Sequence, residues 1–504
     1  DLMEGVANEA ISLAGHLGLG KLIVLYDSND ICLDGKLSTS FSDNIIDRVK
    51  AMNWHTIKVG DGDTNVEAIS AAIEEAKKAT DKPTLIEIKT TIGYGAPNKG
   101  GTNGVHGAPL GANEYLETKT KLNWNYEPFT VPTEVKENFV NGVIARGKKK
   151  EAQWNELVNK YREKYPEFYD SLIAAINGEL NINFEEVLPK YEKNESISTR
   201  NASGFTMNAI AKAYDALFGG SADLAHSNMT YLKEQGDFRK ESPEGKNIWF
   251  GVREFGMSSA GNGIMLHGGL RSFVSTFFVF SDYMKGAMRL SSLMNLPVSY
   301  VLTHDSIGVG EDGPTHQPIE QLAALRSMPN MTVFRPADSK ETSAAWYYAV
   351  TNGSTPTSLV LTRQKLPLYD GCAKRALKGG YILKESKKEI PDVILMASGS
   401  EVELIYKAAD ELAARGIDAR VVSIPSFEIF NAQDEAYKES VLPNSVRKRV
   451  AVEALTSFGW YQYVGLDGRI ISLDTFGASG NADALFKQFG FTVENVVNET
   501  MKLF

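Results

Sequence analysis

The sequence predicts an α/β protein in which mainly parallel, twisted sheets are flanked by helices. Apolar residues at helical spacing alternate with short apolar runs along most of the chain, and this alternation is typical of parallel sheets. The 504 residues exceed one ordinary domain, because domains of roughly 100–200 residues predict two to four units. Hydrophobic residues make up 43% and charged residues 23%, a globular composition that excludes disordered and fibrous proteins.

The first region of the chain contains two helix–strand pairs, followed by a connector. The predicted elements are a helix over Glu4–Leu17, a strand over Lys21–Tyr26, a helix near Val66–Ala79 and a strand over Pro83–Ile88. Residues 125–193 differ in character, and their spacing of aromatic and apolar residues predicts exposed amphipathic helices. We therefore expect this stretch to connect two domains.

A second α/β region follows the connector, and a third begins near Tyr381. In the second region we expect strands at Leu217–Gly219, Arg271–Val274, Val298–Leu302, Thr332–Arg335 and Ser358–Leu361, with helices near Met207–Asp215, Met257–Leu266 and Phe280–Met294. In the third region, a helix over Glu401–Ala414 lies between strands at Asp392–Ala397 and Ala419–Ile424, which predicts a βαβ unit.

Charge and cysteine content exclude several classes of partner. The formal net charge of −10 makes general nucleic-acid binding a poor candidate. Apolar runs such as Leu22–Tyr26 are far shorter than the roughly 20 residues that span a bilayer, so no membrane helix is expected. Two cysteines, Cys32 and Cys372, are too few for a disulfide framework, which favours a reducing, cytoplasmic setting.

The densest group of polar residues, Thr303–Pro318, directly follows a predicted strand. It holds His304 and His316, two of only seven histidines in the chain, together with acids and glycines. Ligands of open parallel sheets bind beyond the carboxyl ends of the strands. In an average polar loop the side chains only form hydrogen bonds within the protein. So many polar groups on a rigid scaffold instead favour a functional site.

Two further groups each allow a structural and a functional interpretation. Glu254 stands beside apolar and aromatic residues, so it is a candidate for a raised pKa, although an acid that complements a helix dipole is the plainer interpretation. Phe277, Phe280 and Tyr283 lie three residues apart at a predicted helix start. That spacing fits core packing, or else an aromatic wall for a planar heterocycle.

Several polar residues are candidates for ligand binding. Arg200 and Arg363 lie near predicted strand ends, and convergence of this pair with His304 would form an anion site. Asn29 follows a strand, where it is either a turn residue or an oxygen ligand for a hard cation. The turn at Gly219–Leu224 offers an acid to a ligand, and His106 belongs to a Gly-rich loop too long for a simple connector.

Taken together, these motifs resemble those of transketolase, the thiamine-diphosphate enzyme that moves two-carbon ketol units between phosphorylated sugars. Residues 1–5 resemble the segment after the family's Gly-Asp-Gly, and residues 13–29 continue that motif. Gly219–Leu224, Val252–Met257 and Gly310–Gln317 match in order, so the resemblance covers essentially the whole chain. It implies two thiamine-diphosphate-binding folds and a smaller C-terminal α/β domain, at residues 1–190, 191–372 and 373–504.

The resemblance also implies a role for each candidate residue. Glu254 would meet the aminopyrimidine ring of the cofactor, and the Asn29 side chain and Ile31 carbonyl would bind magnesium or calcium. The residues expected in catalysis are Glu254, His316, His106 and Glu4. Glu4 and Glu9 would belong to a carboxylate relay at the dimer interface, although a spacing of five places them on different faces of an ideal helix. Those expected at the cofactor are Glu254, Phe277, Phe280, Tyr283, Asn29, Ile31 and Asp223. Those expected at the phosphorylated sugar are Arg200, Ser227, His304, Asp312, His316, Arg363 and His106.

The implied activity is ketol transfer from a ketose phosphate to an aldose phosphate in the pentose phosphate pathway, by a cytoplasmic homodimer with active sites at its interface. The alternatives are dihydroxyacetone synthase or another thiamine-diphosphate ketol transferase, and a non-catalytic subunit of a split enzyme. The presence of Glu254, Asp312 and His316 argues against a scaffold, which needs none of them.

Two departures from the family pattern accompany the resemblance. His226 stands where the family commonly has proline, so it alters the loop before Ser227. The family also has much of its first domain, including a metal-binding Asp, before the position of Asp1. We therefore expect a truncated first domain or an N-terminal companion polypeptide, and weak binding of magnesium and thiamine diphosphate by these residues alone.

Overall fold

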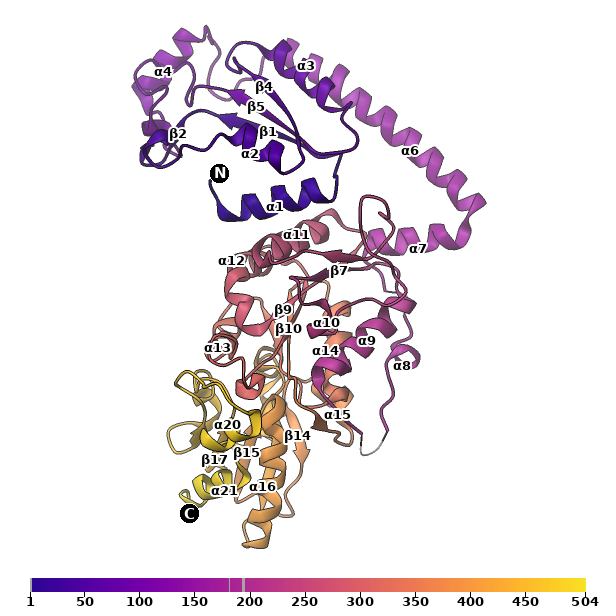
Figure 1. Cartoon of the computed structure of the whole chain (residues 1–504), viewed down its shortest axis with the longest axis vertical. Helices are drawn as coiled ribbons and strands as arrows, with labels where there is room; N and C mark the ends of the chain where they lie inside the picture. Colours follow the sequence, from indigo (N-terminus) through magenta and orange to yellow (C-terminus); the bar gives the residue numbers. More distant parts are fainter. Residues whose placement is uncertain (1, 181, 193–194) are drawn as a thin grey trace. The chain divides into compact units, whose positions relative to one another are not determined.

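The computed structural model describes residues 2–180, 182–192 and 195–504, so Asp1 of the N-terminal motif lies outside the described residues. The chain divides into two compact units, Asp1–Ser171 and Leu172–Phe504. Each unit contains sheets of mainly parallel strands with helices packed against them, which confirms the predicted α/β class (Figure 1). Within the described residues, none of the helices combines the length and the apolar character needed to cross a membrane.

The first unit is built on a three-stranded parallel sheet in the order β1 (Ile23–Ser28), β5 (Thr84–Lys89), β4 (His55–Val59). Its sheet lies between two layers of helices, because successive side chains of β5 point to opposite faces. Leu85 packs with residues of α1 (Gly5–His16) and α2 (Ile45–Ala51), whereas Ile86 packs with residues of α3 (Val66–Ala76). The four predicted elements of this region are confirmed, and α2 and β4 were not predicted.

Beyond this sheet the chain forms a short hairpin and a helical connector. The hairpin pairs β2 (Ile31–Cys32) with β3 (Gly35–Lys36), directly after β1. The later helices are α4 (Ala112–Lys121), α5 (Thr133–Phe139), α6 (Ala145–Lys164), α7 (Pro166–Asn177) and α8 (Phe184–Val187). No described residue of α5 or α6 is buried, in agreement with the exposed amphipathic helices that the sequence predicts.

The second unit begins with a parallel sheet of six strands. Their order is β11 (Thr332–Phe334), β12 (Thr357–Leu361), β10 (Ser299–Thr303), β9 (Arg271–Phe277), β7 (Leu217–Ser221), β8 (Asn247–Trp249). Phe273 of β9 packs with α9 (Thr199–Ala213) and α14 (Ser339–Thr351). The next residue, Val274, faces Gly261 of α11 (Glu254–His267), which packs on α12 (Ser281–Leu293). Helices therefore cover both faces of this sheet (Figure 1).

Three sequence predictions about this sheet need correction. The helix expected from Met207 begins at Thr199, because Ser198 caps it and small residues rather than large apolar ones fill its first turns. Phe277 does not lie on a helix start but ends β9, while Phe280 immediately precedes α12. The turn expected from Gly219 begins later, since Gly219 lies within β7, where a Cβ would stand 1.9 Å from the Phe273 carbonyl oxygen.

The remaining residues form a five-stranded sheet in the order β14 (Tyr381–Lys384), β16 (Ala419–Ser423), β15 (Val393–Ala397), β17 (Arg449–Val452), β18 (Arg469–Ile471). Only β14 is antiparallel to its neighbour, and β15, α16 (Val402–Ala414) and β16 form the predicted βαβ unit. The helices around the sheet include α17 (Phe427–Asn431), α18 (Glu435–Val441), α20 (Ala482–Gln488) and α21 (Val493–Met501).

A buried ion cluster joins the six-stranded and five-stranded sheets. Arg335, directly after β11, has no exposed surface. Its Nε donates to Asp305 Oδ2 at 2.9 Å, and its Nη1 lies 2.5 Å from Glu401 Oε2 and 3.8 Å from Glu453 Oε1. Asp305 follows β10, whereas Glu401 and Glu453 belong to the five-stranded region. One guanidinium therefore ties the two regions together.

Replacing Arg335 should be strongly destabilising. Arg335→Met would take the paired cation from the buried carboxylates of Asp305 and Glu401, whereas Glu453 keeps its pair with Arg326 at 2.8 Å, and breaking a buried ion pair costs about 3–5 kcal/mol. Urea unfolding followed by circular dichroism measures the loss. Arg447→Ala, which removes an exposed pair with Asp467 at 2.8 Å, is the control and should change stability by less than about 1 kcal/mol. Similar small losses for both variants would show that the buried cluster contributes little.

Candidate active site

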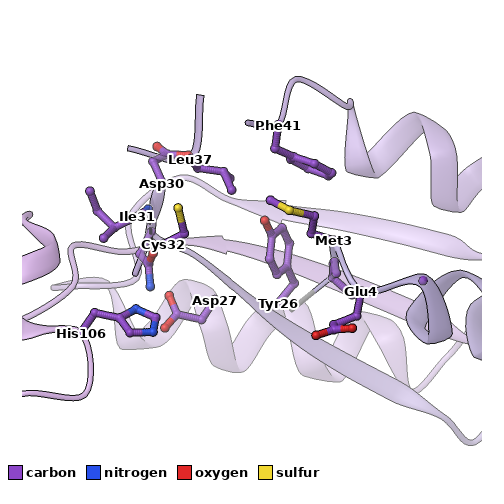
Figure 2. A pocket seen from close by; sticks show the side chains of 13 residues that line it. Met3, Glu4, Tyr26, Asp27, Asp30, Ile31, Cys32, Leu37, Phe41 and His106 are labelled. Carbon is purple, nitrogen blue, oxygen red and sulfur yellow. Dashed lines mark hydrogen bonds between the residues drawn. The ribbon is translucent and has the colours of Figure 1, made fainter. Parts of the chain in front are cut away.

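The first unit contains a cavity of about 620 Å³ beside the carboxyl end of β1 (Figure 2). Four of the candidate residues of this unit, Glu4, Asn29, Ile31 and His106, line it, and Glu9 does not. They come from three distant segments, because the N-terminus of α1, the hairpin after β1 and the loop after β5 meet at the same edge of the sheet. The structure therefore brings together residues that the sequence singled out separately.

The turn after β1 orients the oxygen atoms of this cavity. Asn29 Oδ1 accepts a hydrogen bond from the Ile31 backbone N–H at 3.1 Å, so the side chain folds over its own turn. Asp30 takes a positive φ of 62° and its carboxylate pairs with Lys89 at 3.0 Å, while Asp27 accepts a hydrogen bond from Thr90. Within the described residues, no three His, Cys, Asp or Glu side chains are arranged to hold a metal.

In the second unit, aromatic rings gather at the end of β9. Phe277 and Phe280 stack with centroids 6.0 Å apart and planes 10° apart, and Tyr283 follows at 6.0 Å from Phe280. The His316 ring meets the Phe280 ring at 5.3 Å and 72°, and the His304 ring lies 3.8 Å from that of Phe277. The three aromatic candidates thus form one continuous wall with both histidines, rather than separate pieces of a core.

Glu254 lies close by in the fold, at the start of α11, which packs on α12 and β9. Its side chain is buried, with 8% of its surface exposed. Of the two interpretations that the sequence allows, the structure shows a helix-start acid, and this acid is buried.

His304 begins the polar loop after β10 and is held by a buried chain of hydrogen bonds. Its Nδ1 lies 2.7 Å from Thr303 Oγ1, and that hydroxyl donates to Asn228 Oδ1 at 2.6 Å. Asn228 in turn donates to Ser221 and Ser275, at the ends of β7 and β9. Because the Thr303 hydrogen is committed to Asn228, Nδ1 of His304 is the donor and Nε2 faces the site unprotonated.

Two arginines converge with His304 where β10 and β12 end. Burial, followed by the positive charges of Arg200 and Arg363, lowers the pKa of His304 to about 3. Burial and then Arg363 also lower the pKa of Arg200, whose Nη1 donates to the Ser227 carbonyl oxygen at 3.1 Å. Arg363 Nη1 donates to the Val309 carbonyl oxygen at 2.8 Å. Arg200, Arg363 and His304 thus lie near one another, and their role as an anion site stays a prediction.

Backbone strain marks the same region. Asp223 and His304 both hold positive φ values, 57° and 63°, which non-glycine residues adopt at a cost of about 1–3 kcal/mol. Asp312 lies in the exposed part of the loop that also carries His316. Such strain is typical of binding and catalytic sites, where the surrounding fold holds the backbone of a residue in a conformation that is unfavourable by itself.

Sequence reasoning missed two buried residues of this site. Asn228 connects the strands β7, β9 and β10. Gln317 joins the polar loop to the C-terminal domain, because its Nε2 donates to the carbonyl oxygens of Gly310 at 3.0 Å and Ala478 at 2.9 Å. Both are ordinary amides in the sequence. Their partners lie far along the chain, so only the fold reveals them.

Three family models match the chain. They are described as the thiamine diphosphate binding domain of transketolase over residues 1–181, its pyrimidine binding domain over residues 195–368, and a transketolase-like C-terminal domain over residues 379–492. The chain belongs to the transketolase family. It is accordingly a transferase that moves ketol units between sugar phosphates, with thiamine diphosphate as cofactor, and its three domains correspond to the first α/β unit and the two sheets of the second.

Individual transketolases agree with this family assignment. The chain is 54% identical to the transketolases of Bacillus subtilis (strain 168) and Geobacillus stearothermophilus, over 100% of its own length and 76% of theirs. A Pichia stipitis transketolase crystallised with sedoheptulose 7-phosphate superposes with a TM-score of 0.96 at 44% identity, covering 100% of this chain and 74% of that one. A split-gene transketolase described as an inactive β4 tetramer matches 61% of this chain, with a TM-score of 0.51 at 28% identity.

His304 should remain neutral well below neutral pH. An unfolded histidine titrates near pH 6.5, whereas the pKa of folded His304 is about 3, so between these values the unfolded chain binds more protons. This residue therefore destabilises the fold increasingly as pH falls through that window. Histidine NMR should show no titration of His304 near pH 6.5.

The matched variant is His304→Gln, which cannot take up the proton. It should lose less stability than the wild type between about pH 7 and pH 5. Equal losses in the two proteins would contradict the neutral state of His304.

Proposed function

We propose that this enzyme transfers a two-carbon ketol unit from a ketose phosphate such as xylulose 5-phosphate to an aldose phosphate such as ribose 5-phosphate, in the pentose phosphate pathway. The observation that supports this substrate class most directly is the convergence of Arg200, Arg363 and His304. In a chain of net charge −10, two arginines beside one buried histidine favour an anionic substrate group. The Ser227 backbone, which holds Arg200, completes the proposed phosphate site.

Phosphate binding at this site is expected to bring a proton with it. In the free protein His304 Nε2 carries no hydrogen, since Nδ1 donates to Thr303. To donate to a phosphate oxygen the ring must be protonated, and the phosphate charge offsets the neighbouring arginines that lower its pKa. We assign Asp312 and Asp223 to the hydroxyl groups of the sugar. Both side chains can accept hydrogen bonds, and they lie in the loops that follow β10 and β7.

The cavity of the first unit is proposed to hold the diphosphate end of the cofactor with a divalent cation, magnesium or calcium. Its lining fits a cation better than a bare anion, since Glu4, Asp27 and Asp30 contribute carboxylates. Asn29 Oδ1 and the Ile31 carbonyl oxygen are the proposed metal ligands, because Asp30 is paired with Lys89 and Asp27 accepts from Thr90. When bound, thiamine diphosphate supplies the carbanion chemistry that accepts the two-carbon unit.

Glu254 is the residue we assign to activation of the cofactor. A buried carboxyl at the start of α11, a helix that packs on β9 and α12, can donate a proton to a ring nitrogen of an aminopyrimidine, and Phe277, Phe280 and Tyr283 are proposed to cover the ring. His316 is proposed to exchange protons with the substrate hydroxyl through Nε2, because Thr315 Oγ1 engages its Nδ1 at 3.0 Å. His106 of the first unit is proposed to assist at the same sugar.

We also propose a homodimer in the cytoplasm, with Glu4 and Glu9 in a carboxylate relay at the interface. Both cysteines are free thiols, as a reducing compartment would keep them.

A companion polypeptide remains a prediction, tested by intact mass spectrometry of the purified protein. The inactive split-gene protein matches only 61% of this chain. The family models that match this chain include the thiamine-diphosphate-binding domain, which favours catalysis over a scaffold role.

Removing the Glu254 carboxyl should nearly abolish ketol transfer. Glu254→Gln keeps the size of the side chain but removes its acid, and general acid–base catalysis contributes roughly 10²–10⁴-fold to a rate. Turnover at saturating thiamine diphosphate is the measurement, with the melting temperature as a check on the fold. Wild-type turnover in Glu254→Gln would sink this assignment.

Arg363→Ala should weaken binding of phosphorylated substrates selectively. Losing a charged hydrogen-bond partner costs about 1.5–3 kcal/mol, which is roughly a 10- to 150-fold rise in KM. Assays with ribose 5-phosphate and with unphosphorylated glycolaldehyde as acceptors, under the same donor, separate the two effects. If both acceptors lose equally, Arg363 does not recognise the phosphate. Arg447→Ala, at an exposed surface pair, is the control and should leave both KM values unchanged.

A further inference from the structure

The loop that carries Asp312 and His316 is anchored at both ends in the C-terminal domain. Ile307 and Ile319, on either side of it, are buried in a cluster made mainly of C-terminal residues such as Leu395 and Leu485. The Ile319 carbonyl oxygen accepts a hydrogen bond from Thr456 N–H at 3.1 Å. The loop belongs to the pyrimidine-binding domain in sequence, but its ends pack as part of the next domain.

Between these anchors, the segment Gly477–Gly480 lies directly against the loop. Ser479 Oγ donates to the Glu311 carbonyl oxygen at 2.6 Å, next to Asp312. Gln317, next to His316, is 2% exposed, and its Nε2 donates to the carbonyl oxygens of both Gly310 and Ala478. Each of the two polar candidates therefore has a neighbour in sequence that is hydrogen-bonded to the C-terminal domain.

Glycines allow this close approach on both sides. Gly310 and Gly313 hold φ values of 84° and 73°, and a Cβ on Gly313 would stand 3.2 Å from Ser479 Cβ. On the opposite side, a Cβ on Gly477 would stand 1.9 Å from Gln317 Oε1. Any larger residue at position 477 would displace the Gln317 side chain, so the observed position of Gln317 requires a glycine there.

We propose that Gln317, Gly477 and Ser479 are positioning residues for ketol transfer. Through them the C-terminal domain sets the conformation of the loop that presents Asp312 and His316 to the sugar. This inference rests on the roles proposed above for those two residues. It gives the C-terminal domain a function in the reaction although none of its own side chains is assigned to the substrate.

The decisive variant is Gly477→Ala, made in the holoenzyme. Gly477 does not have a positive φ, so alanine is compatible with its backbone, but its Cβ displaces the Gln317 amide and breaks both Nε2 hydrogen bonds. A displacement of about 1 Å in a positioned group can cost roughly 100-fold in rate. We expect kcat/KM for the ketose phosphate to fall about 10- to 100-fold with thiamine-diphosphate affinity unchanged, and the melting temperature to fall slightly because two buried hydrogen bonds are lost.

Gly480→Ala is the matched control, three residues away in the same segment. Its Cβ would meet only Leu485 Cδ2, at 3.4 Å, which is ordinary contact, so activity should stay at the wild-type level. Ser479→Ala should lower kcat/KM in the same direction as Gly477→Ala, and Ser479→Thr, which keeps the hydroxyl, should restore it. Wild-type kcat/KM in Gly477→Ala, or an equal loss in Gly480→Ala, would overturn the proposal.

A double-mutant cycle separates positioning from general destabilisation. If Gly477 acts through His316, adding Gly477→Ala to His316→Ala should cause little further loss, because coupled residues are non-additive. Full additivity, or a parallel loss of cofactor affinity and melting temperature, would mean that the substitution acts on the fold alone. Wild-type activity in both His316→Ala and Asp312→Ala would instead refute the proposed function of the loop, so the two failures are distinguishable.

Discussion

One buried cation is the interaction on which the geometry of the second unit depends. Arg335 is surrounded by Asp305, Glu401 and Glu453, all of them almost completely buried. Asp305 immediately follows His304, so the same ion pair that joins the sheets also fixes the backbone of the strained histidine. Because unpaired charges are so unfavourable in a protein interior, neither domain can relax at this junction without the other.

Next to this ion cluster, the loops of the site are held by hydrogen bonds of backbone and side-chain amide groups. Asn228 joins the ends of β7, β9 and β10 without reaching the surface, and Gln317 joins the loop after β10 to the C-terminal domain. The amide nitrogen and oxygen of Asn228 and the Nε2 of Gln317 have partners, and breaking these buried hydrogen bonds is unfavourable, which restricts the loops to few conformations. The cationic cluster is thereby assembled before any ligand arrives, and little ordering is needed on binding.

How much of this could be predicted from the sequence depends on the range of each interaction. Strand and helix order follows from local apolar spacing and was predicted. The strand ends of a parallel sheet meet at one edge, which explains why His304 and Arg363 lie close together, whereas Arg200 reaches them from the first turn of α9. The start of α9 was not predicted, because small buried residues carry no apolar periodicity. Arg335 and Gln317 were not singled out either, since their partners lie up to 161 residues away.

The contact between Gln317 and Gly477 also constrains how such a protein can change over evolutionary time. A recombination event between codons 317 and 477 would combine a polar loop from one gene with a C-terminal domain from another. The hybrid keeps the close approach only if the incoming domain brings a glycine to that position. A hybrid whose incoming domain has a larger residue at that position would have to displace the Gln317 side chain.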